Sequence, residues 1–309
     1  MCWMPADWRD QIGGHECLFF GATGWPAKVP DHVSLWDSLI KFRRDFDQYV
    51  NMRPVKLMPG IRSPLADRKP GDIDFIVVRE NTEGFYADRN MALGHSEILV
   101  TDDVAISMRR ITRVCCERIA RSAFELARLR QKRLTLVHKA NVLRITDGLF
   151  LQACADVGQD FPDVAVDDFI VDAMMAHVVR SPEKFDVIVT TNMFGDILSD
   201  LTAELSGSLG LGGSLNAGAH HAMGQAAHGS APDIAGQNIA NPFSQVLSAA
   251  MLLAWHASRH NQPHFWAASQ AMEKAVSDCV AFGECTRDIG GLLGTRETGD
   301  ALCRRLQAA

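Results

Sequence analysis

The sequence predicts an α/β protein whose mainly parallel sheet is flanked by helices. Short, continuously apolar runs rich in Val, Ile, Leu or Phe have the composition of strands buried on both faces. Four such runs occur, at residues 17–21, 75–78, 134–137 and 187–189. Helix-length segments with apolar residues at helical spacing lie between them. This alternation of strands and helices is typical of an α/β chain.

Three helices are predicted from periodicity, at residues 34–50, 102–129 and 241 to about 258. The first begins with Ser34 and Asp37, which form a capping-box pattern. The third begins with Asn241 and Pro242, a cap residue followed by a proline suited to the first helical turn. The sequence therefore indicates where each helix starts.

A chain of 309 residues is long enough for two domains. Periodicity lapses in the Gly/Ser/Leu-rich stretch at residues 207–218, and Arg53-Pro54 follows the first long helix. We expect the chain to cross between domains at these two places.

The charge and cysteine content exclude several classes of protein. A net charge of −6 argues against a nucleic-acid partner, because phosphate binding needs an excess of basic residues on one face. Eight scattered cysteines with no C-x-x-C pair form neither a zinc framework nor a disulfide scaffold. The N-terminus lacks the basic and apolar regions of a signal peptide, and no apolar run is long enough to span a bilayer. The sequence therefore predicts a soluble, cytoplasmic protein.

A pair of carboxylates follows the strand that ends near residue 191. Asp196 and Asp200 lie four residues apart at the start of a helix, so both project from one face. Their repulsion would be relieved by a hard divalent cation such as Mg²⁺ or Mn²⁺, and Asp172 is a possible third oxygen donor. The alternative is that Asp196 only complements the helix dipole while Asp200 faces solvent.

Lys139 and Tyr86 are candidate proton-transfer groups. A lysine at the end of a buried strand can have a depressed pKa and act as a base, and a nearby tyrosine can donate a proton. An ordinary ion pair and an ordinary buried phenol are the alternatives. Arg43, Arg53 and Arg79 each stand beside an apolar run, which suits bidentate binding of substrate carboxylates.

The chain contains neither a G-x-G-x-x-G pattern nor a P-loop, so a nucleotide would not bind in the ordinary Rossmann manner. The remaining candidate is residues 228–236, where small residues let backbone N–H groups approach a ligand. Asp233 could accept hydrogen bonds from ribose hydroxyls. The alternative is a solvated turn before the helix that begins at Asn241.

Four short polar segments end otherwise apolar strands, at residues 79–86, 138–142, 192–200 and 228–236. With these segments in this order, the chain resembles the metal-dependent β-decarboxylating dehydrogenases, which act on isocitrate, isopropylmalate, homoisocitrate, tartrate or D-malate. The match runs from about residue 10 to the C-terminus and includes Thr286-Arg287-Asp288-Ile289-Gly290-Gly291. The resemblance implies an isopropylmalate dehydrogenase-like fold with two domains. Residues 1–50 plus 207–309 would bind the cofactor, and residues 51–206 would provide the substrate, metal and dimerisation domain.

The resemblance also assigns roles to individual residues. Substrate binding falls to Arg43, Arg53, Arg79 and Asn141. Tyr86 would protonate the enol, and Lys139 would assist deprotonation of the substrate hydroxyl. The metal ligands would be Asp172, Asp196 and Asp200. In the family, the lysine and the first of these aspartates reach into the partner subunit's site, which implies a homodimer.

The cofactor would be wrapped by a single segment of the chain. The resemblance assigns this role to His228, Gly229, Ser230, Ala231, Asp233 and Asn241. An aspartate at the position of Asp233 is found in NAD-using members, because a carboxylate accepts from a 2′-hydroxyl and repels a 2′-phosphate. The resemblance therefore implies NAD together with Mg²⁺ or Mn²⁺.

Substrate choice in the family depends on the helix before Arg43. The Ser-Leu-Trp start and the continuation of this segment most resemble the tartrate/D-malate branch. Asp37 and Leu39 stand where isocitrate enzymes use a serine and an asparagine, so an extra carboxylate would not be held. Trp36, Leu39 and Ile40 stand where isopropylmalate enzymes contact the isopropyl group. We expect a small 2-hydroxy diacid, with 3-isopropylmalate as the alternative.

Two departures from the family pattern leave another class of function open. The family begins with a strand and a Gly-Asp-Gly-Ile-Gly-type loop, and this sequence starts after them. Gln225 stands where most members have a glutamate. The chain is therefore expected to bind NAD poorly without the missing element, and a truncated gene product or a non-catalytic paralogue is an alternative to a working enzyme.

Overall fold

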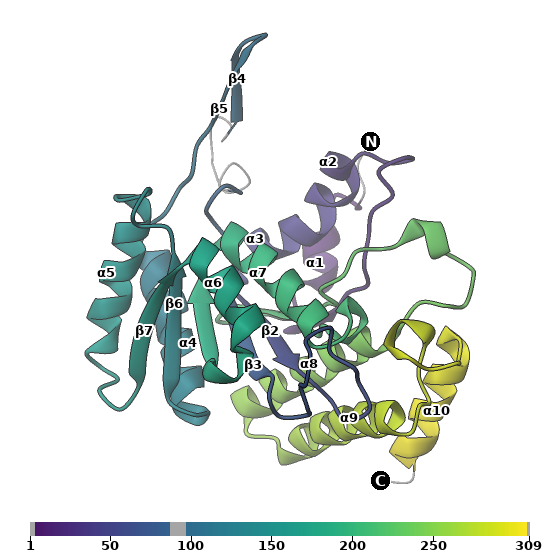
Figure 1. The fold of residues 1–309 in the computed structure, drawn as a ribbon. Coiled ribbons are helices and arrows are strands. Elements are labelled where there is room, and N and C mark those ends of the chain that lie inside the picture. The colour runs from purple at the N-terminus through teal and green to yellow at the C-terminus, as the bar shows by residue number, and fades with distance from the viewer. Residues whose placement is uncertain (1–3, 87–96, 308–309) are drawn as a thin grey trace.

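The computed structural model describes residues 4–86 and 97–307 (Figure 1). Its centre is a sheet of eight strands: β1 (Cys17–Phe19), β2 (Val50–Lys56), β3 (Asp74–Glu80), β6 (Arg133–His138), β7 (Ala165–Ile170), β8 (Val187–Thr190), β9 (Leu215–Ala217) and β10 (Ala222–Gly224). The spatial order is β1-β10-β9-β2-β3-β8-β6-β7, and four of the seven pairings are parallel. The predicted α/β class with a mainly parallel sheet is confirmed.

Helices cover both faces of this sheet (Figure 1). The N-terminal half contains α1 (Trp8–Ile12), α2 (Asp31–Ser34), a π-helical turn at Trp36–Ile40, α3 (Lys41–Asp45), α4 (Arg113–Leu129) and α5 (Thr146–Gly158). The remainder contains α6 (Val171–Arg180), α7 (Asn192–Leu205), α8 (Phe243–His260), α9 (Pro263–Ala281) and α10 (Thr295–Gln307). A two-stranded hairpin of β4 (Glu97–Thr101) and β5 (Val104–Ser107) projects from the body, and its side chains are exposed.

Alternate side chains of the central strands enter two different hydrophobic clusters. Val78 and Leu136 pack with α4 and α5 on one face, whereas Val77 and Val137 pack with α6 and α7 on the other. Burial on both faces explains why these strands are continuously apolar in sequence. A third cluster joins α8, α9 and α10.

The first apolar run behaves differently from the other three. β1 is an edge strand among the described residues, pairing only with β10, and Phe19 is 58% exposed. The expectation that residues 17–21 are buried on both faces was therefore wrong. A strand at the edge of a sheet has fewer neighbours to cover its side chains.

The predicted helix at residues 34–50 differs from the structure at both ends. Ser34 is the last residue of α2, and its hydroxyl donates to the carbonyl of Pro30 instead of capping a helix. The helical segment ends at Asp45, Asp47 is left-handed, and Val50 already belongs to β2. Pairing of β2 with strands on both sides outweighs the local helical spacing.

The second predicted helix begins later than expected. Residues 104–107 form strand β5, and α4 starts at Arg113 after Thr112, whose side chain accepts a hydrogen bond from the Cys115 N–H. The third helix is confirmed: Asn241 Oδ1 accepts from the Phe243 N–H at the start of α8.

The two predicted crossing points contain regular structure. Arg53-Pro54 lies inside β2, where β9 pairs only with residues 50–52, so the proline stands beyond the end of that neighbour. Residues 215–217 of the second crossing form β9. One sheet thus runs through both segments, and the two-domain division stays a prediction.

The structure also bears on two expectations drawn from composition. All seven cysteines among the described residues are free. No helix in the described part of the chain is both long and apolar enough to cross a membrane.

Candidate active site

Two arginines from adjacent antiparallel strands form the floor of the candidate site. In the register of β2 and β3, Arg53 pairs with Val77 and Arg79 with Asn51, so the two arginines are diagonal neighbours on one face. Helix α7 crosses this face. A Cβ atom on Gly195 would lie 2.7 Å from Arg79 Cβ, so only glycine allows the helix to approach the strand this closely.

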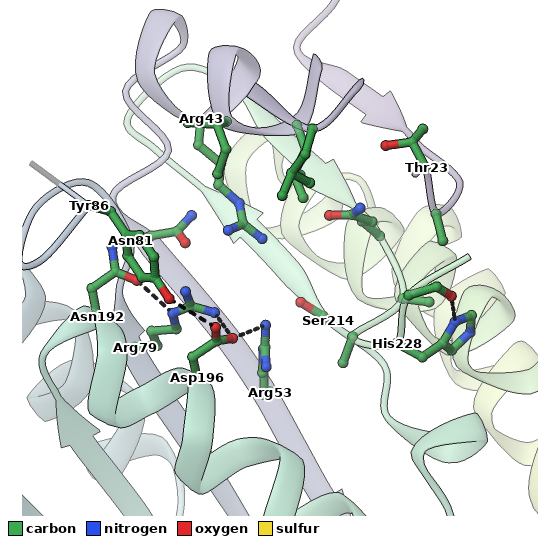
Figure 2. A pocket seen from close by; sticks show the side chains of 18 of the residues that line it. Thr23, Arg43, Arg53, Arg79, Asn81, Tyr86, Asn192, Asp196, Ser214 and His228 are labelled. Carbon is green, nitrogen blue, oxygen red and sulfur yellow. Dashed lines mark hydrogen bonds and ion pairs between the residues drawn. The ribbon is translucent and has the colours of Figure 1, made fainter. Parts of the chain in front are cut away.

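A polar stripe on α7 receives both guanidinium groups (Figure 2). It consists of Asn192, Asp196, Ser199 and Asp200. The helix begins at Asn192, so the expectation that the two aspartates lie at its start was wrong, because neither is in the first turn. Arg79 donates from Nε to Asn192 Oδ1 (2.9 Å) and from Nη1 to Asp196 Oδ1. Arg53 Nη2 lies 3.2 Å from the same carboxylate oxygen. The two guanidinium groups therefore share one carboxylate.

Arg53 makes further contacts that fix its position. Its Nη1 donates to Ser199 Oγ (2.6 Å) and to Asp200 Oδ1 (3.2 Å), and its Nε donates to Asn51 Oδ1 (2.8 Å). Sequence reasoning missed Asn192 and Ser199. Polar residues spaced i, i+4, i+7 and i+8 along one side of an otherwise apolar helix were the signal that could have found them.

Arg43 of α3 adds a third guanidinium group, which points toward the same space (Figure 2). Its buried Nε has no hydrogen-bond partner among the described residues. Burial, together with the positive charges of Arg79 and Arg53, lowers the pKa of Arg43. Burial and Arg79 also lower the pKa of Arg53, to about 10. Burial is the main cause of both shifts, and the mutual repulsion of the arginines adds to them; an anionic ligand would relieve that repulsion.

The three arginines line a cavity of about 240 Å³, slightly below the usual range of about 300–1,000 Å³ for ligand sites. Its other wall is apolar and contains Leu35, Leu39 and Ile40. Trp36, expected beside Leu39 and Ile40, is not among the lining residues and is 42% exposed. That expectation came from the family resemblance; the segment that begins at Trp36 is a π-helical turn, in which side chains have a different angular spacing from those of an α-helix.

Tyr86 also lines the cavity, and its hydroxyl donates to Asp196 Oδ2 at 3.5 Å. The two carboxylates of α7 have opposite pKa shifts. Although burial opposes ionisation, Arg79 and Arg53 lower the pKa of Asp196. Burial raises the pKa of Asp200, where the Arg53 charge does not fully compensate. Asp196 is therefore the main counter-ion of the arginines.

The remaining residues predicted to bind substrate or metal lie elsewhere. Lys139 Nζ donates to Asp172 Oδ1 (2.6 Å), a bond that lowers the pKa of Asp172. Neither residue lines the cavity, and Asn141 is exposed and also outside it. Within the described chain, the donor oxygens of Asp172 do not come together with those of Asp196 and Asp200. A single chain thus assembles only part of the predicted site.

The backbone of Lys139 is held by buried side chains that sequence reasoning missed. Its N–H donates to Asp147 Oδ2 (2.6 Å), and the fully buried Asp147 also accepts from Arg109. His138 accepts from the Ala140 N–H at Nδ1, and its Nε2 lies 2.9 Å from Asp168 Oδ2. These contacts fix the start of the loop after β6.

A second cavity of about 770 Å³ lies beside the first. Five of the six predicted cofactor-binding residues line it: His228, Gly229, Ser230, Ala231 and Asn241. His228 and Gly229 line both cavities, so the two meet at this segment. Asp233 is exposed and is not among the lining residues, whereas Arg296 is. A long ligand in the second cavity could extend one end toward the arginines.

Comparisons with known proteins agree with this architecture. The profile of the family described as isocitrate/isopropylmalate dehydrogenase matches residues 2–302. The chain is 41% identical to D-malate dehydrogenase (decarboxylating) of Escherichia coli strain K12, over 97% of this chain and 83% of the relative. It is 40% identical to tartrate dehydrogenase/decarboxylase of Pseudomonas putida, over 97% and 82%. The crystal structure of isocitrate dehydrogenase from Methylococcus capsulatus superposes with a TM-score of 0.84 at 35% identity, over 98% and 85%.

The opposite pKa shifts predict that the two carboxylates of α7 differ in their effect on metal-free stability. Asp196→Asn should lower the melting temperature near neutral pH by about 1–2 °C, the shift that ~1 kcal/mol produces in a chain of this size. Asp200→Asn should leave it unchanged or raise it. Melting curves recorded in EDTA measure the difference.

The pH dependence provides the control. A carboxylate whose folded-state pKa is lowered stabilises the fold above its unfolded-state pKa, and this contribution is lost as the pH falls through the folded-state pKa. The Asp196→Asn defect should therefore shrink on acidification. A larger loss from Asp200→Asn than from Asp196→Asn at neutral pH would contradict the charge assignment.

Proposed function

The chain belongs to the isocitrate/isopropylmalate dehydrogenase family, and from this premise we propose that it oxidatively decarboxylates a small 2-hydroxy diacid of the D-malate or tartrate type. NAD would be the hydride acceptor, and Mg²⁺ or Mn²⁺ the required cation. The observation that carries this proposal is the group of three guanidinium groups around one small cavity, with the Asp196 carboxylate and the Tyr86 hydroxyl at its edge.

Substrate binding is proposed to complete the charge pairing in this cavity. Arg43, Arg53 and Arg79 together exceed the charge of Asp196, and Arg43 Nε is a buried donor without a partner among the described residues. A carboxylate can accept two parallel hydrogen bonds from a guanidinium group. A dianion of four or five carbons would therefore satisfy donors that the protein leaves unpaired.

The acidic residues fit a divalent cation if two copies of the chain combine. Asp196 and Asp200 provide oxygen donors on one helix face, with side chains 37% and 56% exposed, and the partner's Asp172 would provide the third. When bound, the cation would lower the pKa of the substrate hydroxyl and stabilise negative charge during loss of CO₂. Asp172 supports this arrangement because it is 69% exposed and lies outside its own cavity.

Proton transfer is assigned to one residue from each copy. Lys139 of one protomer would accept the hydroxyl proton at Nζ, and its side chain is 25% exposed beside Asp172. Tyr86 of the other would donate its phenolic proton to the enol carbon after CO₂ has left. Its hydrogen bond to Asp196 would keep the phenol at the edge of the substrate cavity. The homodimer is therefore proposed as the catalytic unit.

The nucleotide is proposed to occupy the larger cavity, with its nicotinamide near His228 and Gly229, where the two cavities meet. The proposed preference for NAD rests on Asp233, whose carboxylate would accept from a ribose 2′-hydroxyl. Arg296 lines the cavity and would instead suit a 2′-phosphate. The residue that reaches the ribose therefore decides between NAD and NADP.

A second candidate substrate is 3-isopropylmalate. The wall formed by Leu35, Leu39 and Ile40 could hold a branched alkyl group. Isocitrate is less favoured because Leu39, which lines the cavity, stands where the resemblance places an asparagine in isocitrate enzymes and cannot donate to a third carboxylate.

A mixture of two inactive variants should regain activity if each site is shared between protomers. Lys139→Ala and Asp196→Asn would each abolish turnover alone. In a mixed dimer, one site receives the intact Asp196 of one chain and the intact Lys139 of the other. With random pairing, about a quarter of all sites should be active. Turnover with excess Mg²⁺ after co-refolding measures this.

A site contained within one chain gives a different result, because every site then carries one defect and the mixture stays inactive. The control is a mixture of Asp196→Asn with Asp200→Asn, whose defects fall in the same half-site and should not complement. Full turnover of the wild type in excess EDTA would remove the cation from the mechanism.

Tyr86→Phe and Lys139→Ala should affect different steps. Lys139→Ala should lose activity on the hydroxy acid by about 10²–10⁴-fold, as expected for loss of a general base. Tyr86→Phe should impair protonation of the enol more than hydride transfer. Its turnover should therefore be reduced with the β-keto intermediate as substrate, as it is with the hydroxy acid. Comparing both substrates for both variants separates the steps. Normal oxidation of the hydroxy acid by Lys139→Ala would show that the base is another group.

The proposal also predicts an order of kcat/KM values. D-malate or a tartrate with NAD should exceed 3-isopropylmalate, which should exceed isocitrate, and Asp233→Ala should reduce discrimination against NADP. Arg296→Ala is the matched control. If the wild type preferred NADP and Arg296→Ala lost that preference, the ribose contact would be assigned to Arg296 instead of Asp233. Absence of turnover with all four acids and both cofactors would favour a non-catalytic paralogue.

A further inference from the structure

A group of metal-binding side chains lies where the start of β1 meets the end of α8. Glu16 immediately precedes β1, and His256 and His260 stand on the last turns of α8, four residues apart on one face. Their donor atoms all lie within 4.8 Å of one another. No other group of three or more His, Cys, Asp or Glu among the described residues meets this criterion. None of the three lines either cavity of the candidate active site.

The distances between the donor atoms suit one small cation. His260 Nε2 is 2.5 Å from Glu16 Oε2, and His256 Nδ1 is 4.0 Å from the same oxygen. The two imidazole rings lie 4.5 Å apart between centroids. Ligands bound to zinc at about 2.0–2.2 Å in a tetrahedron are roughly 3.3–3.5 Å apart. This ligand–ligand distance lies between the 2.5 Å and 4.0 Å separations of the Glu16 oxygen from the two histidine nitrogens. Small rotations of the side chains would therefore bring all three donor atoms to zinc-binding distance.

The donor types select the metal. Two imidazoles and one carboxylate favour Zn²⁺ and its first-row neighbours, whereas Mg²⁺ prefers oxygen donors and water. All three side chains are 25–39% exposed, so the cation can enter from solvent and keep a water as its fourth ligand.

Arg259 is the neighbouring group that opposes a cation. Its Nε lies 3.7 Å from the other oxygen of Glu16, Oε1, which leaves Oε2 toward the histidines. The guanidinium group also stacks on Trp255 and lies 3.4 Å from His220 Nδ1, so it has partners away from the metal position. Arg259 should weaken cation binding without blocking it.

We propose that Glu16, His256 and His260 form a Zn²⁺-binding site separate from the active-site cation. The bound ion would join residues 244 positions apart in the chain, from the start of the edge strand β1 to the end of α8. A ligand that binds only the folded state stabilises it. The alternative reading of the same contacts is a Glu16–His260 ion pair without metal.

Zinc titration by calorimetry tests the site in the full-length protein after removal of metal with a chelator. Saturating Mg²⁺ and an Asp196→Asn/Asp200→Asn background exclude the active-site carboxylates. We expect one Zn²⁺ per chain, an increase in melting temperature of several degrees, and a Co²⁺ spectrum typical of nitrogen and oxygen ligands.

His260→Gln should weaken Zn²⁺ binding by more than about tenfold, since loss of an outer partner alone typically costs 10- to 100-fold. His264→Gln is the matched control, because His264 is an exposed histidine nearby on α9 that is not part of the donor group. Arg259→Gln should tighten binding, since it removes a like charge beside the ion. Equal melting curves of these variants in chelator show that each one folds.

Three results would overturn the site. His260→Gln could bind Zn²⁺ as tightly as the wild type, or His264→Gln could lose as much affinity as His260→Gln. In the third result, Zn²⁺ leaves the melting temperature of the wild type unchanged, and His260→Gln lowers the melting temperature in chelator. The three side chains would then form only a Glu16–His260 ion pair. A near-ultraviolet thiolate band with Co²⁺ that is lost in Cys17→Ser would keep the site and add Cys17, whose Sγ lies 3.7 Å from His256 Nδ1.

Discussion

The candidate active site depends on the Asp196 carboxylate held between Arg53 and Arg79. Three guanidinium groups, including that of Arg43, surround this one shared carboxylate. Removing such charges from water is costly unless each is paired. The protein pairs two of them through Asp196 and its neighbours on α7, and it leaves positive charge facing the cavity. Stability and anion binding therefore depend on the same few atoms.

The sheet makes this arrangement possible. Arg53 and Arg79 are diagonal neighbours in the pairing of β2 with β3, the last of three consecutive antiparallel pairings before the parallel part of the sheet begins at β3 and β8. α7 can reach both because Gly195 carries no side chain against Arg79. The polar stripe of α7 replaces what would be an apolar stripe in a purely structural helix.

Sequence predicted the parts of the molecule that local chemistry determines. The buried central strands, the Asn241 cap and the placement of Asp196 and Asp200 on one face of a helix were found from residues alone. The errors occurred where long-range pairing decides the structure. Val50 and Arg53-Pro54 belong to a strand whose partners are distant in sequence, and residues 104–107 form an exposed hairpin. The separation of Lys139 from its own cavity likewise has no local signal, and only the family resemblance anticipated it.

In the proposed mechanism, the two carboxylates of α7 would make the cation and the substrate favour each other's binding. Asp196 pairs with Arg53 and Arg79, and burial disfavours the charged form of Asp200. A cation placed between them would stabilise the ionised form of Asp200 and draw Asp196 away from Arg53 and Arg79. Both arginines would then need a new anion, which the substrate carboxylates provide. A substrate that binds first would free Asp196 for the cation by the same exchange of partners, so each ligand would strengthen the binding of the other.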